Sequence, residues 1–356
     1  MLTLAAGLRY MTHMPGSSHA RPLLPLSGAD TELRDCLEKH VAVLAGEIGE
    51  RNLWRYEALT ASADYIEKAF QAIGYRVVSQ NYVVHGKTVR NLEAALPGTS
   101  PSGEIVVIGA HYDSVAGSPG ANDNATGVAA LLEIARLLAQ EKPARSVRFV
   151  AFVNEEPPFF YTLEMGSRVY ARRARERGEK IVAMFSLETI GYYADAKGSQ
   201  HYPILFSPFY PDTANFIAFV GNLASRDLVQ ACVASFRSRA AFPSEGIAAP
   251  GWMGGVHWSD HWSFWQEGYP AIMVTDTALY RYEHYHAKTD TPDKIDYERL
   301  ARVAAGLAVV TRDLAASAGE KQEARSCLQA SVKIGTSKET KASILTFQQI
   351  PNFGAS

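Results

Sequence analysis

The sequence predicts an α/β fold with a mixed, mostly parallel central sheet sandwiched by helices. Short apolar runs of strand length recur through the middle of the chain, at residues 105–110, 147–153, 181–187 and 271–274. Helical patterns separate most of these runs, and this alternation is typical of a parallel sheet covered on both faces. Ligands of such sheets gather beyond the carboxyl ends of the strands, so polar residues at those ends are the first candidates for a functional site.

The composition narrows the classes of function. The chain has 356 residues, 47% of them hydrophobic, and a net charge of -2. It can bury a full core, and it lacks the basic character expected of a nucleic-acid-binding protein. No apolar stretch approaches the roughly 18 residues that span a bilayer, so a membrane partner is not expected. Its three cysteines are too widely spaced for a disulfide framework or a CxxC motif: Cys36, Cys232 and Cys327.

The segment patterns predict three parts. Residues 1–28 lack periodicity and are interpreted as a loose N-terminal arm, and residues 29–318 form the main domain. Within that domain residues 195–258 are interpreted as a lid-like insertion, with a helix from Thr213 to about Arg239 and a loop over 240–257. The polar tail, 319–356, shows no strong periodicity.

The N-terminal residues lack the basic segment and the cleavage site that are typical of a signal peptide. A cytoplasmic location is therefore the default expectation, with export left open.

The first chemical signal follows the run at 105–110. His111 and Asp113 end this run, and a Gly/Ser/Pro-rich loop then leads to Asp123 at the start of a helical pattern. A histidine and a carboxylate are thereby placed at one edge of the sheet.

Three more signals lie at or beyond later strand ends. Glu155 and Glu156 directly follow the run at 147–153, Glu188 follows the run at 181–187, and His286 lies in a loop before the last helical pattern. Each alone is more readily interpreted as a solvated surface residue. Together with the first signal they supply two imidazoles and three carboxylates, a donor set suited to Zn²⁺ or a similar divalent ion: His111, Asp123, Glu156, Glu188 and His286.

A shared aspartate would allow two metals. If Asp123 bridges, each ion receives one histidine, one terminal carboxylate and one shared oxygen, with space for a water between them. Two ions about 3.5–4 Å apart can activate such a water and polarise a carbonyl.

At this point the chain resembles the co-catalytic zinc aminopeptidases of the M28 peptidase clan. The matching pieces occur in family order over roughly residues 53–316: GAHYDSV, SPGANDNATGVAALLE, VNEEPPFF followed by MGS, SLETIG, SDHWSFWQEGYPAIMVTDT and YHAKTDTPD. The resemblance implies a zinc-dependent exopeptidase fold, with residues 29–318 as the peptidase domain.

The resemblance also assigns roles to the candidate residues. It implies that the five residues of the donor set hold zinc, with Asp123 as the bridge, and that two ions are bound per chain, with a single ion or another divalent metal left open. It makes Glu155 the general base, Asp113 the residue that orients the His111 imidazole, and Tyr285 a donor to the developing oxyanion. The peptide bond between Asp123 and Asn124 is cis in many relatives.

Two positions depart from the family pattern. Glu188 stands where the aminopeptidases most often have Asp, and Ala287 follows His286 where Thr is usual. Neither change removes a coordinating group, but both leave the number of metals and the substrate open.

The function expected from these features is that of a metallo-aminopeptidase. Its substrate would be a peptide with a free N-terminus, hydrolysed by a metal-activated water with Glu155 as base. A glutaminyl cyclase-like acyl transferase with a single zinc, or a non-catalytic receptor-like domain, remain alternatives. Aromatic residues that could line a pocket for an apolar side chain are Phe159, Phe160, Tyr161, Phe209, Tyr210, Trp252 and Trp258. The sequence does not predict the oligomeric state.

Overall fold

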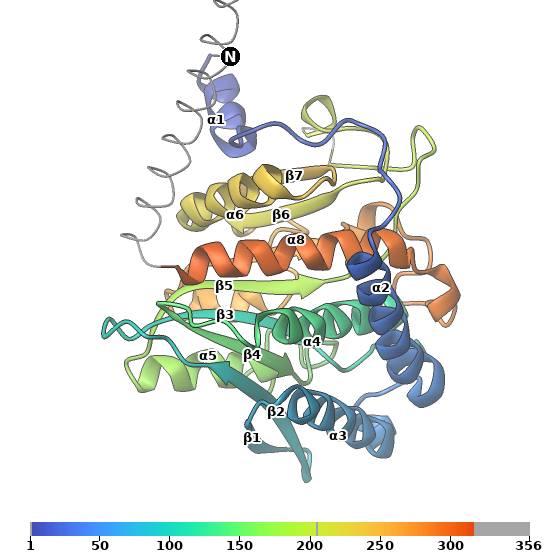
Figure 1. Ribbon diagram of the computed structural model, residues 1–356, viewed down its shortest axis with the longest axis vertical. Helices are drawn as coiled ribbons and strands as arrows, with labels where there is room; N and C mark the ends of the chain where they lie inside the picture. Colours follow the sequence, from blue (N-terminus) through green and yellow to red (C-terminus); the bar gives the residue numbers. More distant parts are fainter. Residues whose placement is uncertain (1, 204–205, 317–356) are drawn as a thin grey trace, which may run out of the picture. The chain divides into compact units, whose positions relative to one another are not determined.

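The computed structural model describes residues 2–203 and 206–316. One eight-stranded sheet forms its centre, in the order β1-β2-β4-β3-β5-β8-β6-β7 (Figure 1). The strands are β1 (Val77–Val84), β2 (Lys87–Leu96), β3 (Glu104–His111), β4 (Ser146–Phe152), β5 (Lys180–Glu188), β6 (Ile217–Asn222), β7 (Ser244–Ala249) and β8 (Ala271–Thr275). The neighbours β4, β3, β5 and β8 are parallel, whereas β1, β2 and the β6–β8 pair introduce antiparallel contacts. The predicted mixed, mostly parallel sheet is confirmed.

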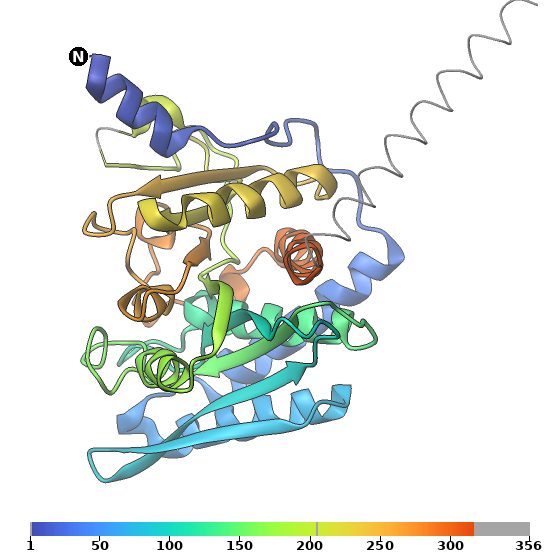
Figure 2. The same cartoon turned by 90° about the vertical axis from the view of Figure 1, so that its left-hand side faces the viewer.

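Helices cover both faces of this sheet (Figure 2). They are α1 (Leu2–Thr12), α2 (Gly28–Val41), α3 (Tyr56–Ile73), α4 (Thr126–Leu138), α5 (Gly166–Glu176), α6 (Arg226–Arg239), α7 (His261–Gln266) and α8 (Tyr297–Ala315). Side chains of β3 alternate between the faces: Val106 and Ile108 join the core under α4 and α8, and Ile105 and Val107 join the core with α5 and α7. The strand is therefore apolar throughout because both of its faces are buried.

The stretch interpreted as a lid mostly extends the sheet. The expected helix from Thr213 to Arg239 is wrong in its first half, because Ile217–Asn222 forms β6 and the helix α6 begins only at Arg226. The expected loop over 240–257 also contains β7. The apolar run IAFVGN leads into the amphipathic helix α6 without a clear break in the sequence. Its residues were therefore assigned to one longer helical pattern. Residues 204 and 205, and the tail 319–356, lie outside the described residues.

The N-terminal arm is docked, contrary to its interpretation as a loose segment. It begins with α1, which lies beside the edge strand β7 (Figure 1). The chain that follows is held by side chains of α6: Gln230 donates to the carbonyl of His13 at 3.2 Å, and Arg237 donates to the carbonyl of Pro15 at 3.2 Å. Met14 is buried against this layer. The segment thus covers an edge strand that would otherwise expose unpaired backbone groups.

Within the described residues, none of the helices combines the length and the apolar character needed to cross a bilayer.

The docking of the arm predicts a measurable contribution to stability. Met14→Ala should lower the free energy of unfolding by about 2 kcal/mol, because it removes a buried side chain and leaves a cavity. The matched control is Leu24→Ala in the same arm, where the side chain is 77% exposed and the change should stay within about 0.5 kcal/mol. Urea unfolding would measure both, and equal stabilities for the two variants would contradict docking.

Candidate metal centre

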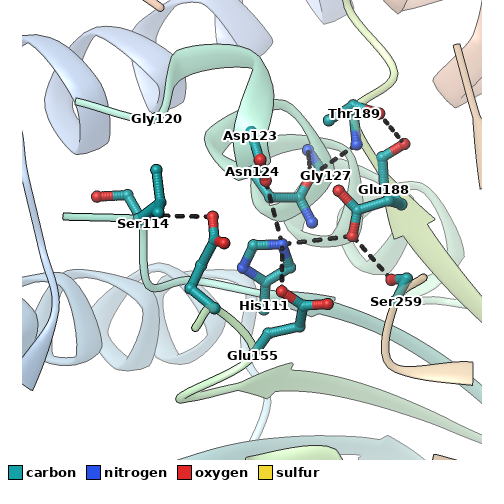
Figure 3. A network of polar contacts seen from close by, with 12 residues as sticks. His111, Ser114, Gly120, Asp123, Asn124, Gly127, Glu155, Glu188, Thr189 and Ser259 are labelled. Carbon is teal, nitrogen blue, oxygen red and sulfur yellow. Dashed lines mark hydrogen bonds and ion pairs between the residues drawn. The ribbon is translucent and has the colours of Figure 1, made fainter. Parts of the chain in front are cut away.

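The candidate residues converge at the carboxyl ends of the parallel strands (Figure 3). His111 is the last residue of β3, and Glu188 is the last residue of β5. Glu155 and Glu156 follow the end of β4, and Asp123 lies in the turn Ala121–Ala125 that leads into α4. The alternation of strand and helix brings these distant segments to one edge of the sheet, as the sequence predicts.

Asp123 lies between two histidines. Its Oδ1 is 3.3 Å from Nε2 of His111, and its Oδ2 is 3.1 Å from Nε2 of His286. Each carboxylate oxygen therefore faces a different imidazole, which is the arrangement that a bridging ligand requires.

One further carboxylate completes each side of Asp123. Glu188 Oε2 lies 3.3 Å from Nε2 of His111, and Glu156 Oε2 lies 3.3 Å from Nε2 of His286. Two groups of one histidine and one glutamate thus share Asp123. The structure brings together all five residues of the predicted donor set.

The donor atoms fit a divalent cation. His111 Nε2 and Asp123 Oδ1 are buried and make no hydrogen bond in the part of the chain that the structure describes. Burial and the neighbouring Asp123 raise the pKa of Glu156 to about 7, and burial raises the pKa of Glu188 above its usual value. Unpartnered nitrogen and oxygen atoms beside crowded carboxylates are satisfied by a metal of the kind that binds imidazole and carboxylate.

Glu155 also lies beside His111, but farther from it than Glu188 does. Its Oε2 is 3.8 Å from His111 Nε2, and the side chain lines the cleft above the donor set. Burial raises the pKa of Glu155 well above its ordinary value; His111 opposes this shift, whereas Glu188 and Glu156 reinforce it. A carboxyl group with a raised pKa can accept and return a proton near neutral pH.

Asp113 holds the backbone beside Glu155. Its two carboxylate oxygens accept hydrogen bonds from the backbone N–H groups of Glu155 and Glu156, each at 3.1 Å. The expected contact with His111 is weaker: Nδ1 lies 3.1 Å from the backbone oxygen of Asp113 and 3.6 Å from its carboxylate. Asp113 therefore touches the histidine mainly through its main chain, while its carboxylate fixes the loop that carries the two glutamates.

Tyr285 lies beside His286. Its ring stacks on His286, with centroids 4.0 Å apart, and it lines the same cleft as Glu155. Burial and the nearby carboxylates raise its pKa well above the usual value. The hydroxyl therefore stays protonated and can act as a hydrogen-bond donor.

Two carboxylates missed by sequence reasoning support the position of Asp123. Asp290 accepts hydrogen bonds from the backbone N–H groups of Asn122 at 2.8 Å and Asp123 at 3.1 Å. Asp276 accepts from the Asn122 side-chain amide at 2.9 Å. Asp276 directly follows strand β8, so the strand-end signal that singled out Glu188 could have found it, whereas Asp290 lies in the later loop before α8, where no strand end marks it. The Asp123–Asn124 peptide bond is cis.

Glu188 also has a partner that the sequence did not indicate. The Ser259 hydroxyl donates to Glu188 Oε2 at 2.7 Å and lies 2.5 Å from the Ser186 hydroxyl (Figure 3). By contrast, His261 is buried away from Glu188, with its Nε2 2.8 Å from the carbonyl of Val256.

Two cavities meet at the site. The cleft over the donor set has a volume of about 790 Å³, including its open part, and Phe160 and Tyr161 belong to its walls. A second, mostly apolar cavity of about 900 Å³, also partly open, shares three residues with the cleft: Glu188, Trp258 and Tyr285. Its other walls include Phe206, Tyr210, Phe216, Val220, Val256 and Met273.

Comparison with known proteins identifies relatives of the chain. It is 42% identical over 281 residues to the uncharacterized protein YfbL of Escherichia coli (strain K12), covering 76% of this chain and 85% of that protein. It is 24% identical over 305 residues to leucine aminopeptidase 1 of Trichophyton equinum, covering 75% and 73%. The crystal structure of the LapA aminopeptidase of Legionella pneumophila shares the fold, with a TM-score of 0.65, 17% identity and coverage of 84% and 78%.

The family model "Peptidase family M28" matches residues 91–311, a range that holds every residue of the donor set as well as Asp113, Glu155 and Tyr285. The predicted resemblance is confirmed, and the chain belongs to peptidase family M28.

Proposed function

We propose that this protein is a metallo-aminopeptidase that removes the N-terminal residue of peptides. The observation that carries the proposal is the position of Asp123, which faces a different histidine with each oxygen while Glu155 lies beside the pair. Membership of family M28 and the similarity to a leucine aminopeptidase support it.

Zinc is the proposed metal, with two ions per chain. His111 and Glu188 would hold one ion, His286 and Glu156 the other, and Asp123 both. When bound, the ions would lower the pKa of a water and polarise the scissile carbonyl.

The protein's own residues account for the proton transfers. Glu155 takes a proton from the attacking water and returns it to the leaving amine, a role that its raised pKa favours. Tyr285 donates a hydrogen bond to the oxygen that gains negative charge. The surrounding carboxylates attract the ammonium group of the substrate, which favours a free N-terminus over an internal peptide bond.

The apolar cavity suggests which N-terminal side chains of the substrate the enzyme prefers. It opens beside Glu188 and Tyr285, and its walls are mostly aromatic and aliphatic. A large apolar N-terminal side chain would be desolvated there, whereas an acidic one would lose hydration beside the carboxylates of Glu188 and Glu245.

The role of Glu155 can be tested by Glu155→Gln. The amide keeps the shape but cannot accept the proton, so we expect kcat for leucine amide to fall by about 10²–10⁴-fold with unchanged zinc content. The matched control is Glu164→Gln, a side chain 43% exposed on the same loop, which should leave kcat unchanged. Near wild-type turnover in Glu155→Gln would remove Glu155 from the mechanism.

Metal counting separates the proposal from its alternatives. Purified protein should contain two zinc ions per chain, lose activity on chelation and regain it with zinc; Glu188→Ala and Glu156→Ala should each lower the count to one. A single zinc with cyclisation of N-terminal glutamine would instead favour a glutaminyl cyclase-like enzyme. Failure to bind any divalent ion would favour a receptor-like domain.

Zinc binding should depend on pH. In the metal-free protein, burial lowers the pKa of His286, but hydrogen bonds to Asp123 and Glu156 raise it more, to about 10, and the pKa of Glu156 is about 7. A metal needs the neutral imidazole and the ionised carboxylate, so it must displace these protons. Apparent zinc affinity should therefore increase from pH 6 to pH 8, with proton release that calorimetry in buffers of different ionisation enthalpy detects. A pH-independent affinity would contradict the pKa directions.

A further inference from the structure

The aromatic residues near the metal centre form two separate surfaces. Tyr210 and Phe206 line the apolar cavity, whereas Phe160 and Tyr161 line the cleft on the side of Glu155. Trp258 belongs to both cavities and lies where they meet. The sequence grouped Phe160, Tyr161, Tyr210 and Trp258 into one candidate pocket, but the structure divides them between two surfaces, and Phe206 joins the surface of the apolar cavity.

Phe160 and Tyr161 form what we call the aromatic shelf. Their ring centroids are 3.9 Å apart, and the Tyr161 ring packs on Trp262 at 4.6 Å and stacks with His257 at 5.5 Å. The Tyr161 hydroxyl also contacts His257 Nδ1. Despite these contacts Tyr161 remains 39% exposed. An aromatic ring that is fixed from behind and open to a cleft provides a preformed apolar surface for a ligand.

The backbone of Tyr161 supports a functional reading of the shelf. Its φ is 64°, in the left-handed region that a bulky residue rarely adopts. Such conformations cost about 1–3 kcal/mol each and persist at ligand and active sites where the surrounding structure fixes them.

The location of Glu155 indicates which part of a peptide the shelf meets. Under the proposed function, Glu155 returns a proton to the leaving amine, so the departing part of the substrate lies on its side of the cleft. Phe160 and Tyr161 follow Glu155 on the same loop and line the same cleft. The apolar cavity meets this cleft at the shared residues Glu188, Trp258 and Tyr285, does not include Glu155, and is left for the N-terminal side chain.

We propose that the aromatic shelf binds the side chain of the second residue of the substrate and favours an apolar residue there. The enzyme would then bind the side chains of both residues that flank the scissile bond, the first in the apolar cavity and the second on the aromatic shelf. This inference rests on the proposed function, and it assigns peptides with two apolar residues at their N-terminus as the favoured substrate class.

The test compares substrates that differ only beyond the scissile bond: Leu-Leu, Leu-Gly and leucine amide. The zinc-loaded wild type should have a kcat/KM for Leu-Leu about tenfold above that for Leu-Gly, with the difference mainly in KM. Tyr161→Ala should reduce this ratio to about one, whereas Tyr161→Phe, which keeps the ring, should preserve it.

Trp54→Ala is the matched control. Trp54 is an aromatic residue 56% exposed that stacks on Phe159, outside the walls of the cleft, so its loss should leave the ratio unchanged. If Tyr161→Ala fails to fold, as judged by thermal unfolding and zinc content, Phe160→Ala takes its place with the same expectation.

The outcomes distinguish the shelf from the proposed function. An unchanged Leu-Leu to Leu-Gly ratio in the folded shelf variants, or no preference in the wild type, would overturn the shelf while leaving the aminopeptidase intact. Equal losses for all three substrates, including leucine amide, would also overturn it, because they indicate a structural role. Absence of hydrolysis of every substrate by the zinc-loaded wild type would overturn the aminopeptidase proposal itself.

Discussion

The site depends on a cluster of buried carboxylates whose negative charge must be compensated by positive charge. Asp123, Glu155, Glu156 and Glu188 are all at least nine-tenths buried around two imidazoles. Their mutual repulsion raises the pKa of Glu155 and Glu156 on top of the effect of burial. A cluster of this kind is costly in an apolar interior unless cations compensate it. Hydrogen bonds from distant segments hold the main chain that carries these carboxylates.

A buried arginine provides much of that support. Arg51, which precedes α3, is fully buried and donates to the carbonyls of Tyr112 at 2.6 Å and Gly120 at 2.8 Å. These carbonyls belong to the loop that connects His111 to Asp123. Burial lowers the pKa of Arg51 to about 10, so the guanidinium remains charged at neutral pH. With Asp290 on the backbone of Asp123, Arg51 fixes both ends of the loop from segments far away in sequence.

The contrast between local and distant signals explains what the sequence could predict. Strand ends were predictable because a strand buried on both faces is mostly apolar, so the ionisable residues that end it, such as His111 and Glu188, are conspicuous. Arg51 and Asp290 act on main-chain atoms more than 60 residues away, and no periodicity records such a contact. The arm and β6 were misinterpreted for the same reason, since docking onto α6 and pairing with β8 are tertiary effects that override weak local patterns.

Contacts from distant residues also hold Glu188, which stands where the resemblance to the aminopeptidases implies an aspartate. The side chain of glutamate is one methylene longer than that of aspartate. At an unchanged strand end, the carboxylate could therefore lie in a different place relative to His111. Here Glu188 Oε2 lies 3.3 Å from His111 Nε2, the same distance as Asp123 Oδ1, and the Ser259 hydroxyl holds that oxygen at 2.7 Å. The same oxygen of Glu188 therefore lies beside His111 and accepts the hydrogen bond from Ser259. Glu188 thus keeps a carboxylate oxygen facing His111 despite the longer side chain, and Ser259 supports that position.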